Sequence, residues 1–251
     1  MKNMLITLFF YTRAKLEVES YRHFAGIFWW VLDPIIGVAV YYLMLKVFLN
    51  HQEDHYIQFL FIGIFAWKWF VEGITRSSAG ILNNLTLIKK IRIQKYIFPL
   101  IEILNVTWRF LIMFSIMLIA LYLFWFPLTI YALTIPLILL AQFIFIMGLG
   151  LFLSSFIPMF PDLQFLLGHA LRLAFYPSCI LFSAEKLPSQ YQFVLHMNPI
   201  AGLVQSYRQV ILAGRAPLWD VIGTAAIVGI FLGALGLFII NKYDKDYPKL
   251  I

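Results

Sequence analysis

The sequence predicts an all-α integral membrane protein with six transmembrane helices, and three observations carry this prediction. Of the 251 residues, 62% are hydrophobic and only 12% are charged, and the mean hydropathy is +0.86. A soluble domain has about 25% charged residues, so this chain lacks the polar side chains to cover a water-exposed surface. Apolar stretches of about 20 residues, the length that crosses a bilayer, recur along the chain. Basic residues gather in alternate connections between these stretches, as they do at cytoplasmic membrane faces.

The six apolar stretches are predicted at residues 30–49, 57–74, 99–126, 129–156, 165–182 and 218–240. Little more than Phe126-Pro127-Leu128 separates the third from the fourth, so these two are expected to form a tight helical hairpin. Glycine and proline inside the stretches are compatible with spanning helices, because neighbouring helices satisfy the freed backbone groups. We therefore divide the chain into an N-terminal segment, residues 1–29, and a six-helix transmembrane domain, residues 30–251.

The basic residues of the connections predict the orientation. With the N-terminus inside, twelve lysines and arginines fall on the inner side and three on the outer side. Both termini are therefore predicted in the cytoplasm. The same connections account for the net charge of +7, so we expect no nucleic-acid partner. The first residues contain no small-residue cleavage site, which argues against a removable signal peptide.

Two segments on the predicted inner side mix apolar and charged residues. Residues 4–29 are too polar to span and suit an amphipathic helix lying in the membrane interface. The second segment, residues 82–98, suits a cytoplasmic amphipathic helix that contacts anionic lipid or docks into the groove of a partner. Its alternating apolar and basic residues include Leu85, Ile88, Lys89, Lys90, Arg92 and Lys95.

The predicted outer connection, residues 183–214, contains a helix that does not span. Asn198 is a typical N-cap and Pro199 a typical first helical residue. Apolar residues then recur at helical spacing, which predicts a one-sided helix dipping into the outer leaflet. Gly214 is expected to end this helix. Residues 187–196 suit a shorter partner helix before it.

The motifs of enzyme chemistry are missing from the sequence. No Gly-x-x-x-x-Gly-Lys-Ser/Thr occurs, so the chain is not expected to bind ATP through a P-loop. His51, Glu53 and His55 lack the spacing of a zinc-protease helix, and a solvated loop is favoured over a metal site. The sequence therefore predicts a protein that is not an enzyme by itself and that holds no metal or cofactor.

Charged residues inside the predicted spans are informative because one at a helix centre costs about 2.5–3.5 kcal/mol. Lys68 and Glu72 are four residues apart, so their side chains are expected to meet. Glu102 and Arg109 share one helix face, whereas Arg172 has no partner nearby in sequence. Two interpretations stay open, namely structural pairing between helices and a polar transport pathway.

Aromatic residues crowd the first two spans. Flat aromatic faces can slide along sugar rings without fixed hydrogen bonds, whereas lipid-facing aromatic belts are the alternative explanation. The candidates for a substrate channel are Tyr41, Tyr42, Phe48, Phe59, Trp67 and Trp69.

Several stretches, taken in order, resemble one family of membrane proteins. They are Tyr21–Pro34, Gly63 to Trp67, Phe160–Gln164, Tyr176–Ile180, Leu187-Pro188, Asn198-Pro199 and Tyr207-Arg208. In this order and spacing they resemble the permease subunits of ABC transporters that export capsular polysaccharide, teichoic acid, or O-antigen for lipopolysaccharide biosynthesis. Phe160-Pro161-Asp162-Leu163-Gln164 is similar to the form found in capsule exporters. Many O-antigen members have Tyr-Arg-Asp at this position, so the Phe160–Gln164 motif slightly favours a capsule exporter.

The resemblance implies a homodimer in a bacterial inner membrane, with two copies of a separate nucleotide-binding subunit that holds ATP and Mg²⁺. The complex would move a lipid-linked polysaccharide, and the 82–98 helix would couple the permease to the ATPase. The implied gate through which substrate enters comprises Arg22, Gly26, Trp29, Asp33 and Pro34. The implied outer gate comprises Asn198, Pro199, Tyr207 and Arg208.

Two other classes of function remain open from the sequence. Related ABC permeases with the same arrangement of spans export drugs or small lipids. A membrane-embedded enzyme that modifies lipid or glycan is the third possibility, and it would need carboxylates or histidines clustered at one membrane face.

Overall fold

The computed structural model describes residues 28–44, 55–90, 93–127, 129–183 and 197–245, together with residues 12 and 247. Within these ranges the chain is helical and has no strand, which confirms the all-α prediction. The predicted interfacial helix at residues 4–29 lies almost entirely outside the described residues. The short helix expected at residues 187–196 lies wholly outside them.

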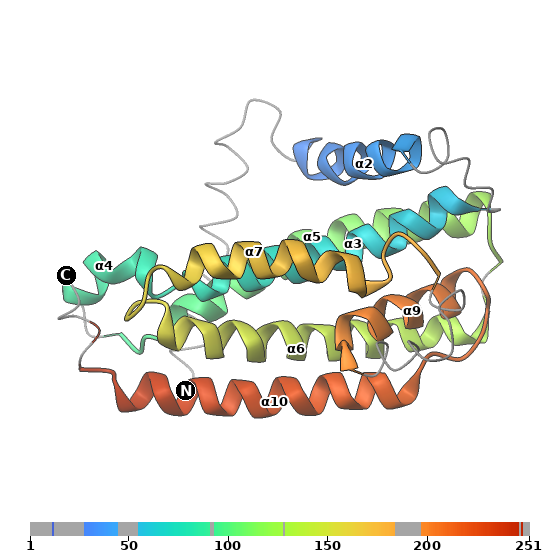
Figure 1. Ribbon diagram of the computed structural model, residues 1–251. Coiled ribbons are helices and arrows are strands. Elements are labelled where there is room, and N and C mark those ends of the chain that lie inside the picture. Colours follow the sequence, from blue (N-terminus) through green and yellow to red (C-terminus); the bar gives the residue numbers. More distant parts are fainter. Residues whose placement is uncertain are drawn as a thin grey trace.

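Within the described part of the chain, four helices are long and apolar enough to cross a membrane. They are α3 (Tyr56–Ser78), α5 (Ile97–Phe124), α6 (Ile135–Phe156, preceded by the 3-10 turn η3 at Ile130–Thr134) and α10 (Trp219–Lys242). At 1.5 Å per residue, each reaches the roughly 30 Å thickness of a hydrocarbon core. These helices correspond to the second, third, fourth and sixth predicted stretches, and they run side by side (Figure 1).

The other two predicted spans are represented by shorter helices, α2 (Phe28–Tyr42) and α7 (Leu163–Phe175). The prediction that the fifth stretch continues to residue 182 is wrong. The α-helix ends at Phe175, a 3-10 turn η4 follows at Tyr176–Ser178, and Cys179 has a positive φ of 53°. Pro177 explains the break, because proline removes a backbone donor and restricts the residue before it.

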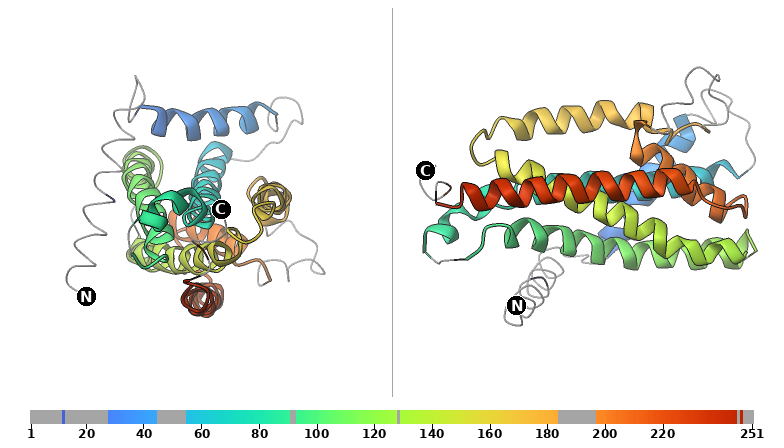
Figure 2. Two further views of the ribbon diagram at one scale, coloured as in Figure 1. Left: turned by 90° about the vertical axis from the view of Figure 1, so that its left-hand side faces the viewer. Right: turned by 90° about the horizontal axis from the view of Figure 1, so that it is seen from below.

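Glycines let α6 and α10 approach each other closely. A Cβ atom added to Gly148 would overlap the carbonyl oxygen of Gly229, and one added to Gly236 would overlap the α6 backbone at Leu151. Small residues of this kind permit backbone contact between membrane helices, where burial from water gives no driving force. The two helices lie along each other in every view (Figures 1 and 2).

Helix α3 lies at the centre of the core. One side of it packs through stacked rings, with Trp69 on Phe110 at 4.1 Å and Phe70 on Phe145 at 5.7 Å between centroids. The buried Gln142 amide of α6 donates to the Ala66 carbonyl at 2.8 Å. The opposite side of α3 faces α2 and α7, and it contributes to the pocket described below.

Short helices mark the two ends of the bundle (Figure 1). Helix α9 (Pro199–Ile211) begins after Asn198 as predicted, and Gly214 lies beyond its end with a positive φ of 59°. The expectation of a one-sided helix is wrong, because eleven of its thirteen residues are buried against α3, α6 and α10. We call this side of the molecule the α9 end.

The opposite side, the α4 end, carries the turn η2 (Leu82–Asn84) and the helix α4 (Leu85–Lys90). The helix predicted over residues 82–98 is therefore too long. The chain leaves helical geometry at residues 93–96, and a new helix, α5, begins at Ile97. The turn into this segment is tight, because Gly80 lies against the backbone of Pro99 and accepts a hydrogen bond from the Asn84 amide at 2.8 Å.

Candidate functional site

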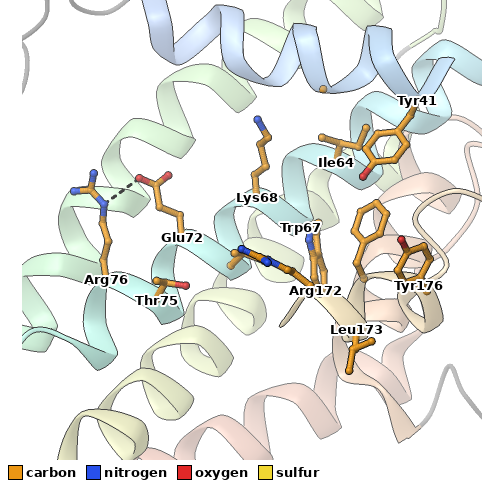
Figure 3. A pocket seen from close by; sticks show the side chains of 13 residues that line it. Tyr41, Ile64, Trp67, Lys68, Glu72, Thr75, Arg76, Arg172, Leu173 and Tyr176 are labelled. Carbon is orange, nitrogen blue, oxygen red and sulfur yellow. Dashed lines mark ion pairs between the residues drawn. The ribbon is translucent and has the colours of Figure 1, made fainter. Parts of the chain in front are cut away.

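A pocket of about 800 Å³ lies between α2, α3 and α7. Its α3 residues recur every three or four positions, so one face of that helix forms the wall. Figure 3 shows the charged side chains toward one end of the pocket and the aromatic rings toward the other. The lining residues are Gly37, Tyr41, Ile64, Trp67, Lys68, Val71, Glu72, Thr75, Arg76, Arg172, Leu173, Phe175 and Tyr176.

Glu72 holds the charged end together. Its Oε1 atom accepts from Arg109 Nη2 of α5 at 2.6 Å and lies 3.1 Å from Arg76 Nε, one turn along α3. The predicted Lys68–Glu72 pair is wrong, because Glu72 forms its ion pairs with these two arginines. The structural interpretation of the intramembrane charges therefore holds for Glu72 and Arg109.

Lys68 and Arg172 come from opposite walls of the pocket. The Lys68 side chain points toward α2, and its end lies close to Gly37 (Figure 3). Arg172, on α7, is exposed and makes no hydrogen bond or ion pair with any described residue. Among the described residues that line the pocket, the charged ones are Lys68, Arg76, Arg172 and Glu72, and Glu72 is paired with Arg76 and with Arg109.

At the aromatic end of the pocket, a ring from α2 packs against a ring from α7. The Tyr41 ring stacks on Phe175 at 5.4 Å, and the Trp67 ring meets Phe175 edge-on at 5.7 Å. Tyr176 is 65% exposed beside them. An aromatic surface next to basic groups can receive a ligand that has both flat rings and an anionic group.

The structure separates the predicted channel aromatics. Tyr41 and Trp67 line the pocket, whereas Trp69 faces the core and donates its indole N–H to Thr107 at 3.3 Å. Phe59 lies beneath a buried arginine at the α9 end. Tyr42 packs on the hydrophobic core, and Phe48 lies outside the described residues.

The sequence did not single out Phe175 or Tyr176 as site residues. Helical spacing from Arg172, which the sequence did flag, would have placed both residues near it, and the structure has Phe175 at the end of α7 and Tyr176 at the start of η4. Three of the residues implied for the substrate gate belong to helix α2, namely Trp29, Asp33 and Pro34. Arg22 and Gly26 lie outside the described residues.

Arg208 organises the α9 end. Its guanidinium is buried and donates to the carbonyls of Cys179 at 2.5 Å, Ile180 at 2.7 Å and Phe59 at 3.2 Å. It also lies 3.3 Å from the centre of the Phe59 ring. One side chain of α9 thereby fixes the start of α3 and the turn after α7.

Of the other residues of the implied outer gate, Tyr207 is buried, and Asn198 and Pro199 are half-buried. Asn198 precedes α9 as expected, but its side chain donates to the Ser178 hydroxyl at 3.0 Å and does not cap the helix. Pro199 is the first helical residue. Tyr207 is fully buried, with its ring edge-on to Phe114 at 5.6 Å.

The predicted coupling residues lie at the α4 end and fall into two groups, those that contact the chain's own residues and those that are exposed. Leu85 and Ile88 are buried against the chain's own residues, including Phe98 and Ile240. Lys95 is paired with Asp244 at 2.9 Å. Among the described residues of the 82–98 segment, the exposed ones are Asn83, Thr86, Lys89, Lys90 and Gln94, and Arg92 lies outside the described residues.

Tyr247 fastens the segment after α10 to this end. Its hydroxyl donates to the Ser155 carbonyl at 2.9 Å, and the ring is fully buried. Burial, followed by the neighbouring Asp244 and Tyr243, raises the pKa of Tyr247 to about 12. The neutral donor form therefore persists at every physiological pH, and the hydrogen bond weakens only in strong base.

The fold and the pocket define a multi-pass helical membrane protein, and comparisons with known proteins define its relatives. Two proteins of Klebsiella pneumoniae, each named O-antigen export system permease protein RfbA, are 27% and 26% identical over 241 residues. Each alignment covers 96% of this chain and 93% of the relative. A protein of the same name from Myxococcus xanthus is 23% identical over 252 residues, covering 100% of this chain and 96% of the relative.

No protein-family model matches the chain. The three relatives nevertheless confirm the resemblance to permease subunits of ABC polysaccharide exporters that the sequence motifs indicated. They are named for O-antigen, so they do not support the slight lean toward capsule that Phe160–Gln164 suggested.

Proposed function

We propose that this chain is the transmembrane subunit of an ATP-driven exporter that moves a lipid-linked, O-antigen-type polysaccharide across a bacterial inner membrane. Similarity over nearly the whole chain to three O-antigen export permeases carries the proposal. The four long apolar helices agree with it. Permeases for drugs or small lipids and membrane-embedded enzymes are less favoured, since these relatives are named as neither.

The proposed topology has six spans with the α4 end in the cytoplasm. Helices α2 and α7, extended by the residues next to them, would supply the first and fifth crossings. Lys89, Lys90 and Lys242 all lie at the α4 end, which suits the cytoplasmic preference of basic residues. Both termini would then be cytoplasmic, and the α9 end would face outward.

The proposed complex contains two copies of this chain and two copies of a separate ATP-binding subunit. Exposed His169 and Arg172 on α7 support a second copy or a polar pathway on that side, because exposure of such residues to lipid is costly. The exposed lysines of α4 support contact with the ATPase, whereas Leu85 and Ile88 would hold α4 against its own chain.

Reversing the charge of Lys89 and Lys90 together is expected to reduce polysaccharide export at least tenfold. The two side chains are exposed and lie on the element proposed to contact the ATPase, so the amount of protein in the membrane should not change. Surface polysaccharide and membrane abundance, measured in the same cells, check this expectation.

Lys242→Glu is the matched control, because Lys242 is exposed at the same end but lies on α10. Export at the wild-type level by the Lys89→Glu/Lys90→Glu variant would contradict the coupling role of α4.

Purification of the tagged chain in a gentle detergent, followed by mass spectrometry, tests the whole proposal. A P-loop ATPase of similar abundance should accompany the chain. Deletion of the gene should abolish surface polysaccharide, and the intact gene should restore it. A deletion strain with normal surface polysaccharide would refute the proposed function.

A further inference from the structure

The short segment that follows α10 is attached to the α4 end at two points. The hydroxyl of Tyr247 donates to the carbonyl of Ser155, near the end of α6, at 2.9 Å, and this hydrogen bond is buried. The carboxylate of Asp244 pairs with Lys95, in the connection between α4 and α5, at 2.9 Å. One short segment is therefore tied both to α6 and to the chain that leads into α5.

Helix α4 depends on tertiary contacts because it has only six residues. An isolated helix shorter than about 12 residues is not stable in water. The buried residues of α4 are Leu85 and Ile88, and both belong to one apolar cluster with Tyr247 and with Ile240 of α10. Tyr247 is the largest fully buried side chain of that cluster. Loss of its ring would therefore open a cavity in the cluster that holds α4.

The same cluster decides which face of α4 is presented to a partner. Leu85 and Ile88 are three residues apart, so they lie on one face of the helix, and Lys89 and Lys90 remain exposed. Figure 1 shows α4 and the last turns of α10 at the same end of the bundle. Coupling between distant sites is carried by packed side chains, hydrogen bonds and rigid elements. A displacement of α4 can reach α6 and α10 only while these contacts hold the helix in place.

We propose that Tyr247 is a positioning residue for transport, and that with the Lys95–Asp244 ion pair it fixes α4 to the ends of the membrane helices. Movement of the ATP-binding subunit against α4 is then passed to these helices. The inference rests on the proposed function and goes beyond it, because it assigns a part in coupling to a segment outside the element proposed to contact the ATPase.

Export and ATP hydrolysis, measured on the same variants, test the inference. Export is the surface polysaccharide per copy of the chain in the membrane, and hydrolysis is measured on the complex purified in lipid nanodiscs. Tyr247→Ala should lower export per copy about tenfold, within the range by which mutations between two sites change their coupling. The ATP-binding subunit should still copurify at the wild-type ratio, with ATP hydrolysis within about twofold of the wild type, because Lys89 and Lys90 are unchanged.

Two gentler changes keep the test valid if Tyr247→Ala lowers the yield. Tyr247→Phe retains the ring and loses one hydrogen bond, so export per copy should fall only about threefold. Lys95→Glu and Asp244→Lys should each lower export per copy, and the double variant should recover it because the ion pair is restored with opposite signs.

The mobility of a spin label reports the position of α4 directly. Lys89→Cys can be labelled selectively, because the chain has a single cysteine, Cys179, and that residue is buried. The label should become more mobile when Tyr247→Ala is added. Tyr243→Ala is the matched control, since Tyr243 is an aromatic residue of the same segment that is 37% exposed and lies outside the cluster. It should leave both label mobility and export unchanged.

The outcomes separate coupling from folding and from the proposed function. Wild-type export per copy by Tyr247→Ala, or unchanged label mobility, would overturn the inference. A parallel loss of export and of the copurifying subunit would assign Tyr247 to assembly and would also overturn it. Normal surface polysaccharide in the gene-deletion strain would instead reject the exporter itself, whatever the Tyr247 variants do.

Discussion

Arg208→Ala is expected to prevent the chain from accumulating as folded protein. The substitution leaves the buried carbonyls of Cys179, Ile180 and Phe59 without their donor, and each such loss costs about 1–3 kcal/mol. A protein stable by about 5–15 kcal/mol cannot absorb three losses of this size without marked unfolding. The fraction of protein in a single monodisperse peak in detergent, and its melting temperature, measure the effect.

Two further variants make the Arg208 prediction specific. Arg208→Lys keeps the charge but lacks the planar set of donors, so its stability should be intermediate. Gly63→Ala should reproduce much of the damage, because the added Cβ would overlap the Arg208 guanidinium. A wild-type melting temperature for Arg208→Ala would show that the three hydrogen bonds contribute little.

Gly148→Ala is expected to destabilise the protein by about 3 kcal/mol, the upper part of the range for inserting one methyl group into a packed interior. The new Cβ would overlap the carbonyl oxygen of Gly229, which is backbone and cannot rotate away. Helices α6 and α10 would have to separate, and they pack along much of their length. Thermal unfolding in detergent and the yield from the membrane would both report this loss.

Gly223→Ala is the matched control on α10. No heavy atom lies within 4 Å of the position of its Cβ, so this variant should unfold within about 0.5 kcal/mol of the wild type. Equal melting temperatures for Gly148→Ala and Gly223→Ala would contradict the close contact between α6 and α10.

These predictions assign different tasks to the parts of the chain. The α6–α10 contact and the Arg208 network form a rigid frame, whereas α2 and α7 pack more loosely around the pocket. Variants of the frame should lower the amount of folded protein. Variants of the α4 lysines should instead change export at a constant amount of protein.

The sequence predicted the four long spanning helices, the start of α9 at Asn198-Pro199 and a basic amphipathic helix at residues 82–98, of which α4 is a part. Each of these rests on a local signal, namely an apolar run, a capping pair or a cluster of charges, and such signals act over a few residues. The resemblance to polysaccharide export permeases likewise rested on short motifs in a fixed order. Arg172 was recognised as a charge without a local partner.

Only the tertiary structure decided which faces of the helices meet. Glu72 binds Arg109, which is 37 residues away, and not Lys68 on its own helix. Arg208 reaches the carbonyl of Phe59, 149 residues away. Trp67 lines the pocket while Trp69 enters the core, although hydropathy treats the two alike. Apolar composition determines that a segment lies in lipid, but the direction of each side chain depends on how the helices pack, and that packing is set by contacts between residues distant in sequence.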